Sequence, residues 1–209
     1  MKTSDNNNNQ NRVANELALL KLAHQKLEHR HTALFKLNQL SQDCDELSSF
    51  YHQVHLVIKS LMTAENFYIV MFDRTLDTLK FVYHVDEEDD TPEGDIPYAS
   101  FKGSLTSYVI ETGKAFLAMP TEIDRMVKNG VLNYMGTTGM DWLGVPLLHD
   151  AYVIGVMAVQ SYSESTRYSD QDKELLTYAA QHIISALIRL QDHEQLQKAV
   201  ASRTTELME

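Results

Sequence analysis

The side chains that could do chemistry are few in this sequence, and the cysteine count is the first constraint. The chain holds one cysteine, Cys44, among 209 residues. One cysteine excludes an internal disulfide, a zinc site built on several thiolates, and an enzyme that needs both an attacking and a resolving thiol. We therefore expect Cys44 to be a small buried side chain, and the low cysteine usage favours a reducing, cytoplasmic location.

Histidines are more numerous, with nine in the chain, and a haem or metal site is one hypothesis that they suggest. His55 flanks the apolar stripe of a predicted helix, and His84 and His182 lie in the region expected to form the core. A lone histidine on an apolar face is usually a hydrogen-bonded core residue rather than a ligand. We predict no metal site, and the sequence identifies no cofactor.

A run of acidic residues is the third candidate. Residues 86–100, DEEDDTPEGDIPYAS, hold seven acids, two prolines and no base. The stretch lacks the regular Asp-x-Asp-x-Asp-Gly spacing of a calcium-binding loop. We interpret it as a solvated loop.

Composition narrows the class of protein. With 29 Asp and Glu against 18 Lys and Arg, the net charge is -11, which argues against nucleic acid as a partner. No apolar run approaches the ~18 residues of a membrane-spanning helix. The N-terminus, MKTSDNNNNQN, has no apolar segment of the kind found in signal peptides. We expect a cytoplasmic protein that does not contact a membrane.

The N-terminal region divides into a tail and a helix. Residues 1–11 are polar and of low complexity, so we predict a disordered tail. Residues 12–41 predict a helix in which apolar residues recur every seven positions; the predicted contact residues are Val13, Leu17, Leu20, Leu27 and Leu34. The helix could pack on its own domain or form a coiled coil between two copies, and the spacing favours the second interpretation, a homodimer.

The middle of the chain predicts an amphipathic helix followed by strands. Apolar residues at helical spacing cover 47–61. Two β-rich stretches, 66–73 and 78–86, flank a four-residue turn and predict a hairpin. A short helix at 103–113, a strand at 114–119, helical turns at 120–130 and a flexible connection at 131–139 follow.

A second hairpin, DWLGVPLLHDAYVIGVMAVQS (141–161), carries the main structural prediction. Strand 153–159 is apolar at every position, whereas a sheet with one wet face would alternate apolar and polar residues. Both faces must therefore be covered. We expect an α+β fold in which the long helices cover one face of an antiparallel sheet, and loops and short helices from 86–139 cover the other.

The C-terminal region predicts one long helix, begun by a capping box of Ser169 and Asp172. After residue 190 the helix keeps only a thin apolar stripe, so it needs a partner helix. The predicted contact residues are Leu190, Leu196, Val200 and Leu207. We interpret 191–209 as a connector helix to an output domain outside this sequence, after a domain at 42–190.

Three stretches together resemble the signature segments of GAF domains. They are SLTSYVIETGKAFLA, WLGVPLLHDAYVIGVMAVQS and YSDQDKELLTYAAQHIISALI, in that order, and the resemblance covers about residues 45–190. It implies a central antiparallel sheet with a helical bundle on one side and a ligand pocket on the other. It also implies dimerisation through terminal helices. The tail AVASRTTEL resembles connectors that precede bacterial output domains, either GGDEF-type diguanylate cyclases or histidine kinases.

The resemblance also limits the ligand. The Asn-Lys-Phe-Asp-Glu motif of cyclic-nucleotide-binding members is missing. Cys44 lies far in sequence from the segments where bilin-binding members carry their cysteine. Aromatic and hydroxyl side chains in 83–142 suit a small planar or apolar ligand. The candidate ligand-binding residues are Tyr83, Tyr98, Phe101, Tyr108, Thr121, Tyr134, Thr138 and Trp142.

The sequence therefore predicts a non-catalytic sensory domain that binds a small molecule and signals through a dimeric helical connector. One alternative is a ligand-free dimerisation module that spaces output domains, in which the candidate aromatics pack only on each other. A more remote alternative is a thiol-dependent enzyme on the same fold.

Overall fold

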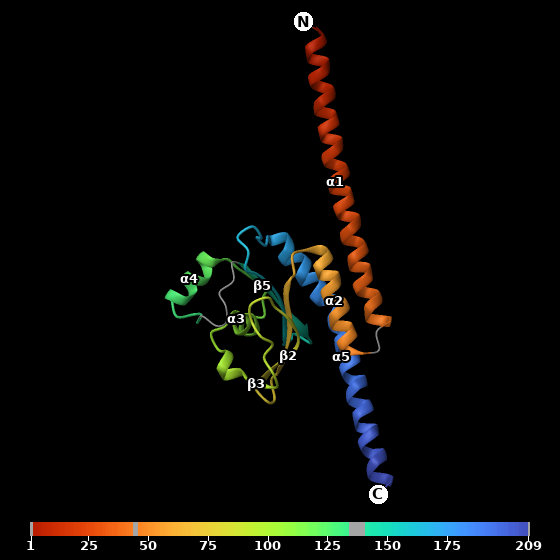
Figure 1. Cartoon of the computed structure of the whole chain (residues 1–209), viewed down its shortest axis with the longest axis vertical. Helices are drawn as coiled ribbons and strands as arrows, with labels where there is room; N and C mark the ends of the chain where they lie inside the picture. The colour runs from red at the N-terminus through yellow and green to blue at the C-terminus, as the bar shows by residue number, and fades with distance from the viewer. Residues whose placement is uncertain (1, 44–45, 134–140, 209) are drawn as a thin grey trace.

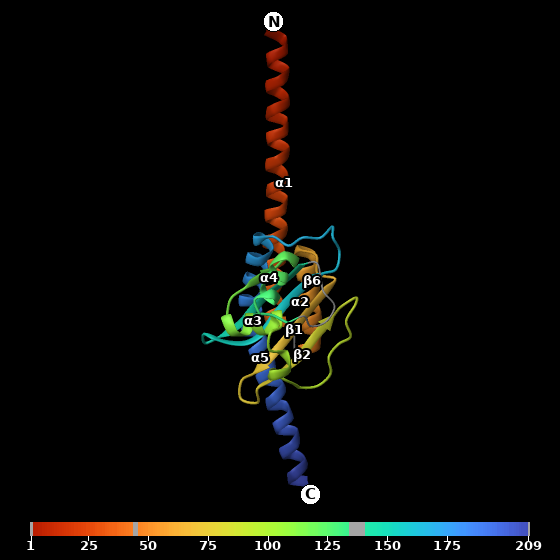
Figure 2. The same ribbon diagram turned by 90° about the vertical axis from the view of Figure 1, so that its left-hand side faces the viewer.

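The structure, a computed structural model, describes residues 2–43, 46–133 and 141–208. The helices are α1 (Lys2–Asp43), α2 (Leu47–Leu61), α3 (Leu105–Thr112), α4 (Pro120–Lys128) and α5 (Asp170–Met208), with a 3-10 helix, η1 (Tyr98–Phe101). The strands are β1 (Asn66–Asp73), β2 (Thr78–Val85), β3 (Ile96–Pro97), β4 (Phe116–Ala118), β5 (Asp141–His149) and β6 (Tyr152–Ser161). Figures 1 and 2 show the long helices on one side of the sheet and the short helices on the other.

The described strands form one antiparallel sheet in the order β3-β2-β1-β6-β5-β4. The two predicted hairpins are present, β1 with β2 and β5 with β6. Strand β6 also pairs with β1, which places β1, β6 and β5 at the centre of the sheet. The predicted α+β fold is confirmed.

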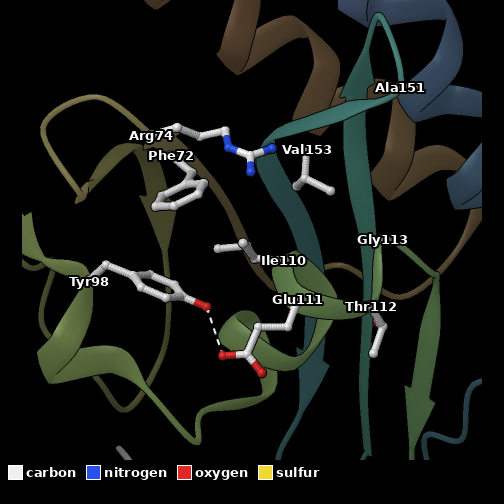
Figure 3. Close-up of a pocket in the computed structure, with 9 residues that line it drawn as sticks. All are labelled: Phe72, Arg74, Tyr98, Ile110, Glu111, Thr112, Gly113, Ala151 and Val153. Atoms are coloured by element: carbon white, nitrogen blue, oxygen red, sulfur yellow. Dashed lines mark hydrogen bonds between the residues drawn. The ribbon is translucent and has the colours of Figure 1, made fainter.

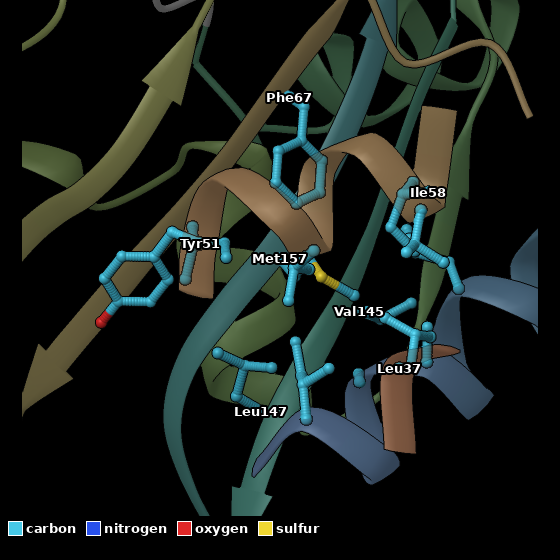
Figure 4. Packing of buried hydrophobic residues seen from close by; sticks show 14 of the residues in the cluster. Leu37, Tyr51, Ile58, Phe67, Val145, Leu147 and Met157 are labelled. Atoms are coloured by element: carbon cyan, nitrogen blue, oxygen red, sulfur yellow. The ribbon is translucent and has the colours of Figure 1, made fainter. Parts of the chain in front are cut away.

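Side chains of the three central strands alternate between two hydrophobic clusters. The face toward the long helices buries Phe67, Ile69, Leu143, Val145, Leu147, Met157 and Val159 (Figure 4). The opposite face buries Tyr68, Val70, Trp142, Val156 and Ala158. Because neighbouring residues of a strand point to opposite faces, this alternation shows that both faces are dry. The main structural prediction from the second hairpin is confirmed.

The helical layer is built by amphipathic packing. Helix α2 buries Phe50, Val54 and Ile58 against the sheet, as its apolar spacing predicts. The last turns of α1 contribute Ala33 and Leu37 to the same cluster, and α1 contacts both α2 and α5. Part of α1 therefore packs on its own domain.

The ends of α1 and α5 extend beyond the packed domain in opposite directions (Figure 1). Helix α1 begins at Lys2, so its range includes residues 2–11, for which composition predicted disorder. The proposed divisions of the chain at residues 11, 41 and 190 remain predictions.

None of the described helices combines the length and the hydrophobicity that crossing a lipid bilayer requires.

Helix α5 begins with the reciprocal capping contacts predicted from its sequence. The backbone N–H of Ser169 donates to Oδ2 of Asp172 at 2.8 Å, and the N–H of Asp172 donates to Oγ of Ser169 at 3.3 Å. These bonds satisfy N–H groups that have no partner within the helix. The cap fixes where the strand-to-helix connection ends.

Short helices cover the face of the sheet opposite the long helices; η1, α3 and α4 together are named the roof. Ser104 caps the start of α3, since its Oγ accepts from the N–H of Ser107 at 3.0 Å. The helix ends at Gly113, which takes a left-handed conformation with φ 62°. The sequence predicted both this helix and its terminal glycine.

The turn between β5 and β6 is strained. Asp150 and Ala151 have φ of 48° and 67°, and two left-handed residues in a row are typical of a type I′ hairpin turn. Glycine is the favoured residue at such a position, because a side chain in this conformation costs roughly 1–2 kcal/mol. Ala151 bears that cost.

We predict that Ala151→Gly raises the free energy of unfolding by about 0.5–1 kcal/mol. The relief of strain exceeds the extra backbone entropy that glycine loses on folding. Chemical denaturation followed by circular dichroism measures the change. Ala99→Gly is the matched control, because Ala99 is also exposed but is not among the described non-glycine residues with positive φ. A loss of stability in Ala151→Gly equal to that in Ala99→Gly would contradict the strained turn.

Candidate ligand site

A hydrogen-bonded trio lies buried between the roof and the sheet. The Nε1–H of Trp142 on β5 donates to the hydroxyl of Tyr68 on β1 at 3.0 Å. That hydroxyl also lies 2.9 Å from the hydroxyl of Thr106 on α3. Burial raises the pKa of Tyr68 to about 12, so the phenol stays protonated. The trio joins the roof to two central strands.

The space beside this trio is filled by side chains. A Cβ built on Gly144 would lie 2.0 Å from Cη2 of Trp142, so the indole occupies the volume that a side chain there would need. The ring of Phe81 packs on Tyr68, and the ring of Phe101 packs on Phe81. In the described part of the chain, no buried side-chain nitrogen or oxygen lacks a hydrogen-bond partner. The interior around Tyr68 is therefore a packed core.

A pocket of about 420 Å³ opens near the hairpin end of the sheet, on the roof side (Figure 3). It is lined by Phe72, Arg74, Tyr98, Ile110, Glu111, Thr112, Gly113, Ala151 and Val153. These residues come from the end of β1, from η1, from the C-terminal turn of α3 and from the β5–β6 hairpin. Its volume is in the range of known small-molecule sites.

Opposite charges line the pocket without pairing with each other. The hydroxyl of Tyr98 donates to Oε1 of Glu111 at 3.1 Å. Burial, together with the nearby Glu111 carboxylate, raises the pKa of Tyr98, so its hydroxyl stays a donor. The guanidinium of Arg74 lies 5.1 Å from the ring centroid of Tyr152. Within the described residues, neither Arg74 nor Glu111 forms an ion pair.

The eight candidate ligand-binding residues do not gather at one site. Tyr98 lines the pocket. Trp142 and Phe101 belong to the hydrophobic cluster on the roof side of the sheet. Tyr108 packs on Phe116, with 4.7 Å between the ring centroids. Their role in ligand binding stays a prediction.

The other four candidates lie elsewhere. Thr121 is exposed on α4, and Tyr134 and Thr138 lie outside the described residues. Tyr83 packs on the hydrophobic cluster between the sheet and the long helices, named the helix-side cluster, and not under the roof. The pairing of β1 with β2 shifts register between Ile69 and Val70. Ile69 lies opposite Tyr83, but the next residue, Val70, lies opposite Phe81, so Val82 is skipped. This bulge places both Val82 and Tyr83 on the helix side.

Tyr83 has a structural partner on α2. Its hydroxyl lies 2.9 Å from Nδ1 of His55, whose Nε2 lies 2.6 Å from the carbonyl oxygen of Ala64. The His55 ring stacks on Phe67 with centroids 4.8 Å apart. Burial lowers the pKa of His55, which favours the neutral ring. This histidine is a hydrogen-bonded core residue, the role that its apolar surroundings predict.

The remaining chemical candidates are dispersed. Nδ1 of His84 lies 3.2 Å from the hydroxyl of Thr91, and the His182 ring lies 4.2 Å from that of Tyr178. Cys44 lies outside the described residues. Across the described ranges, no three His, Cys, Asp or Glu side chains are placed to hold a metal ion.

The start of the acidic loop is tied to the sheet and is not simply solvated. Asp86 accepts hydrogen bonds from Nε2 of Gln160 at 2.6 Å and from the hydroxyl of Tyr162 at 2.9 Å. Burial, then the Asp86 carboxylate, raises the pKa of Tyr162. The N–H of Glu87 donates to Oδ1 of Asn66 at 2.8 Å. The Asp86 carboxylate and the backbone N–H of Glu87 therefore anchor the loop to β6 and β1.

Sequence reasoning missed most of the pocket lining. Arg74 stands in a stretch predicted as a turn, and Ile110 and Glu111 stand in the last turn of a predicted short helix. Nothing in their local pattern indicates that these segments meet. One signal was available: the turns that join β1 to β2 and β5 to β6 lie at the same end of an antiparallel sheet, which indicates that Arg74 and Ala151 are near each other.

Comparisons with known proteins agree with this architecture. A family model for the GAF domain matches residues 46–187. No curated protein sequence matches the chain. A similar solved structure is the GAF domain of phosphoenolpyruvate-protein phosphotransferase from Acinetobacter. The TM-score is 0.61 and the identity 13%, over 77% of this chain and 93% of that one.

Two further solved structures are similar. One is residues 122 to 287 of a methyl-accepting chemotaxis protein, with TM-score 0.55 and 19% identity, covering 74% of this chain and 96% of that one. The other is free methionine-R-sulfoxide reductase from Neisseria meningitidis in complex with its substrate. Its TM-score is 0.58 and its identity 15%, covering 78% of this chain and 90% of that one. Similarity at these identities demonstrates a shared fold.

We predict that Tyr68→Phe lowers the free energy of unfolding by about 1–3 kcal/mol. The substitution leaves the Nε1–H of Trp142 and the hydroxyl of Thr106 without a buried partner. Urea denaturation measures the loss. Tyr152→Phe is the matched control, since Tyr152 is exposed and its ring contact with Arg74 is kept. Equal stability of Tyr68→Phe and wild type would show that the trio does not hold the roof.

Proposed function

Because the chain belongs to the GAF domain family, we propose that it is a non-catalytic sensory domain that binds a small molecule. Similarity of its fold to part of a methyl-accepting chemotaxis protein supports a regulatory role. The observation that carries the proposal is the pocket of about 420 Å³ on the face of the sheet opposite the long helices. A ligand there would contact the same strands on which the helices pack.

The central strands give the pocket a mechanical route to the helices. Strand β6 supplies Val153 to the pocket and Met157 to the helix-side cluster, and α5 packs on β5. Packed layers of this kind shift between discrete arrangements and do not deform continuously. A ligand shifts the balance between two helix arrangements only by its difference in affinity for them.

A buried carboxylate, paired with a half-exposed arginine, gives a second connection at the other end of β5. Asp141 is fully buried and accepts from Nη1 of Arg167 at 2.6 Å and from the N–H of Tyr168 at 3.0 Å. The hydroxyl of Tyr168 in turn donates to the carbonyl of Thr63 at 3.0 Å. These bonds hold the entry to β5, the segment before α5 and the α2–β1 connection together, which supports transmission into α5.

We propose that two copies associate through the terminal helices. The apolar side chains that α1 and the end of α5 expose to solvent include Leu17, Leu20, Leu27, Leu196 and Val200. Leu34 is half-buried against the chain's own core and Leu190 is buried in it, so these two serve the domain itself. The side chains of Val13 and Leu207 lie outside the described residues.

The C-terminal extension suits a connector. Beyond Leu190, α5 shows polar faces around the thin stripe formed by Leu196 and Val200. We propose that in a bacterial signalling protein this helix leads to an output domain, either a GGDEF-type diguanylate cyclase or a histidine kinase.

One alternative has a specific observation in its favour. The space around Tyr68 and Trp142 is filled by side chains, which suits a ligand-free dimerisation module that only spaces output domains. In that case the pocket beside Arg74 would be an ordinary surface hollow.

Native mass spectrometry of the purified chain separates these proposals. At micromolar concentration we expect twice the 23.9 kDa chain mass plus a fixed increment from a co-purifying small molecule. A dimer without any increment favours the ligand-free module. A strictly monomeric mass would contradict signalling through paired helices.

The double substitution Leu20→Glu with Leu27→Glu tests the association surface. Buried like charges at these positions should convert the dimer to monomers while the domain stays folded. Leu76→Glu is the matched control, since Leu76 and Leu20 are each 68% exposed but Leu76 lies in the β1–β2 turn. Retention of the dimer in the double variant would place the interface elsewhere.

A further inference from the structure

We propose that the pocket beside Arg74 binds a zwitterionic amino acid with an apolar or aromatic side chain. This inference rests on the proposed sensory function and names the chemical class of its ligand. Three features carry it: an anionic side, a cationic side and an apolar floor.

The anionic side is formed by Glu111 and the end of α3. The Glu111 carboxylate is held in place by the hydroxyl of Tyr98, which donates to Oε1 at 3.1 Å and keeps its own proton. Thr112 and Gly113 also line the pocket, and the C-terminal end of a helix carries partial negative charge. This side favours an ammonium group.

The cationic side is formed by Arg74. Its guanidinium lies over the ring of Tyr152, which leaves the N–H groups at its edge to bind a carboxylate in a two-point geometry. Figure 3 shows this guanidinium beside Val153, with Glu111 across the pocket and Ile110 between them. Because the two charges do not pair with each other, a ligand can satisfy each of them separately.

The floor between the charges is apolar. Phe72, Ile110 and Val153 line it, and the Phe72 ring lies 4.9 Å from that of Tyr98. Such a surface gains free energy by burying a hydrocarbon or aromatic group. A small molecule that carries an ammonium, a carboxylate and an apolar side chain therefore offers one group to each of the three parts of the pocket. A nucleotide fits less well, since its phosphates would meet Glu111 and the α3 C-terminus.

Isothermal titration calorimetry with three matched probes tests the assignment. L-Phenylalanine carries both charges, 2-phenylethylamine lacks the carboxylate, and 3-phenylpropionate lacks the ammonium. We expect L-phenylalanine to bind and each analogue to bind at least about tenfold more weakly. Arg74→Gln should remove the preference over 2-phenylethylamine, and Glu111→Gln the preference over 3-phenylpropionate. Arg125→Gln, at an exposed ion pair on α4, should change neither preference.

A second measurement, methyl NMR, uses only the wild-type protein, so its result does not depend on whether the variants fold. In wild type, L-phenylalanine should shift the signals of Ile110 and Val153 but not those of Leu37 on the other face of the sheet. No heat and no shift with any of the probes would overturn the amino-acid assignment, as would equal affinity for all three. If a neutral molecule instead co-purifies and shifts the same methyl signals, the assignment fails while the sensory proposal stands. If nothing occupies the pocket, both fail.

Discussion

The structure depends on one constraint: three adjacent strands, β1, β6 and β5, are apolar on both faces. A sheet of this kind cannot leave either face in water, because each exposed face would forfeit the burial of several large side chains. On one side α1, α2 and α5 bury Phe67 and Met157, and on the other the roof buries Tyr68 and Trp142. The two layers are therefore required by the strands between them.

Covering both faces also connects them. A side chain on one face and its neighbour in sequence on the other share a backbone, so a displacement of β6 changes packing on both sides. The trio of Tyr68, Thr106 and Trp142 joins the roof to β1 and β5, and Asp141 joins β5 to the segment that leads into α5. The trio and the Asp141 carboxylate are buried and hydrogen-bonded, which makes their arrangement specific. The pocket lies where the roof, the hairpin turn and the end of β1 meet, away from this filled centre.

Local patterns in the sequence predicted most of the fold. Apolar, β-rich stretches on either side of short turns located the hairpins, and apolar residues at helical spacing located α2. Gly113 marked the end of α3, and Ser169 with Asp172 marked the start of α5. The ligand site was predicted less well because its residues depend on register and on contacts distant in sequence. A bulge in β2 turns Tyr83 toward His55, and strand alternation alone does not reveal a bulge. Arg74 and Glu111 are brought together only by the folded sheet.

The central claim is that β1, β6 and β5 form a strand core sealed by a layer on each face. Native-state hydrogen exchange of backbone amides measures this directly. We expect amides of Val70, Val145 and Val156 to exchange only through global unfolding, with protection that falls in parallel with stability as denaturant is added. Rapid exchange of these amides, by local opening insensitive to denaturant, would mean that one face is open to water and would contradict the account.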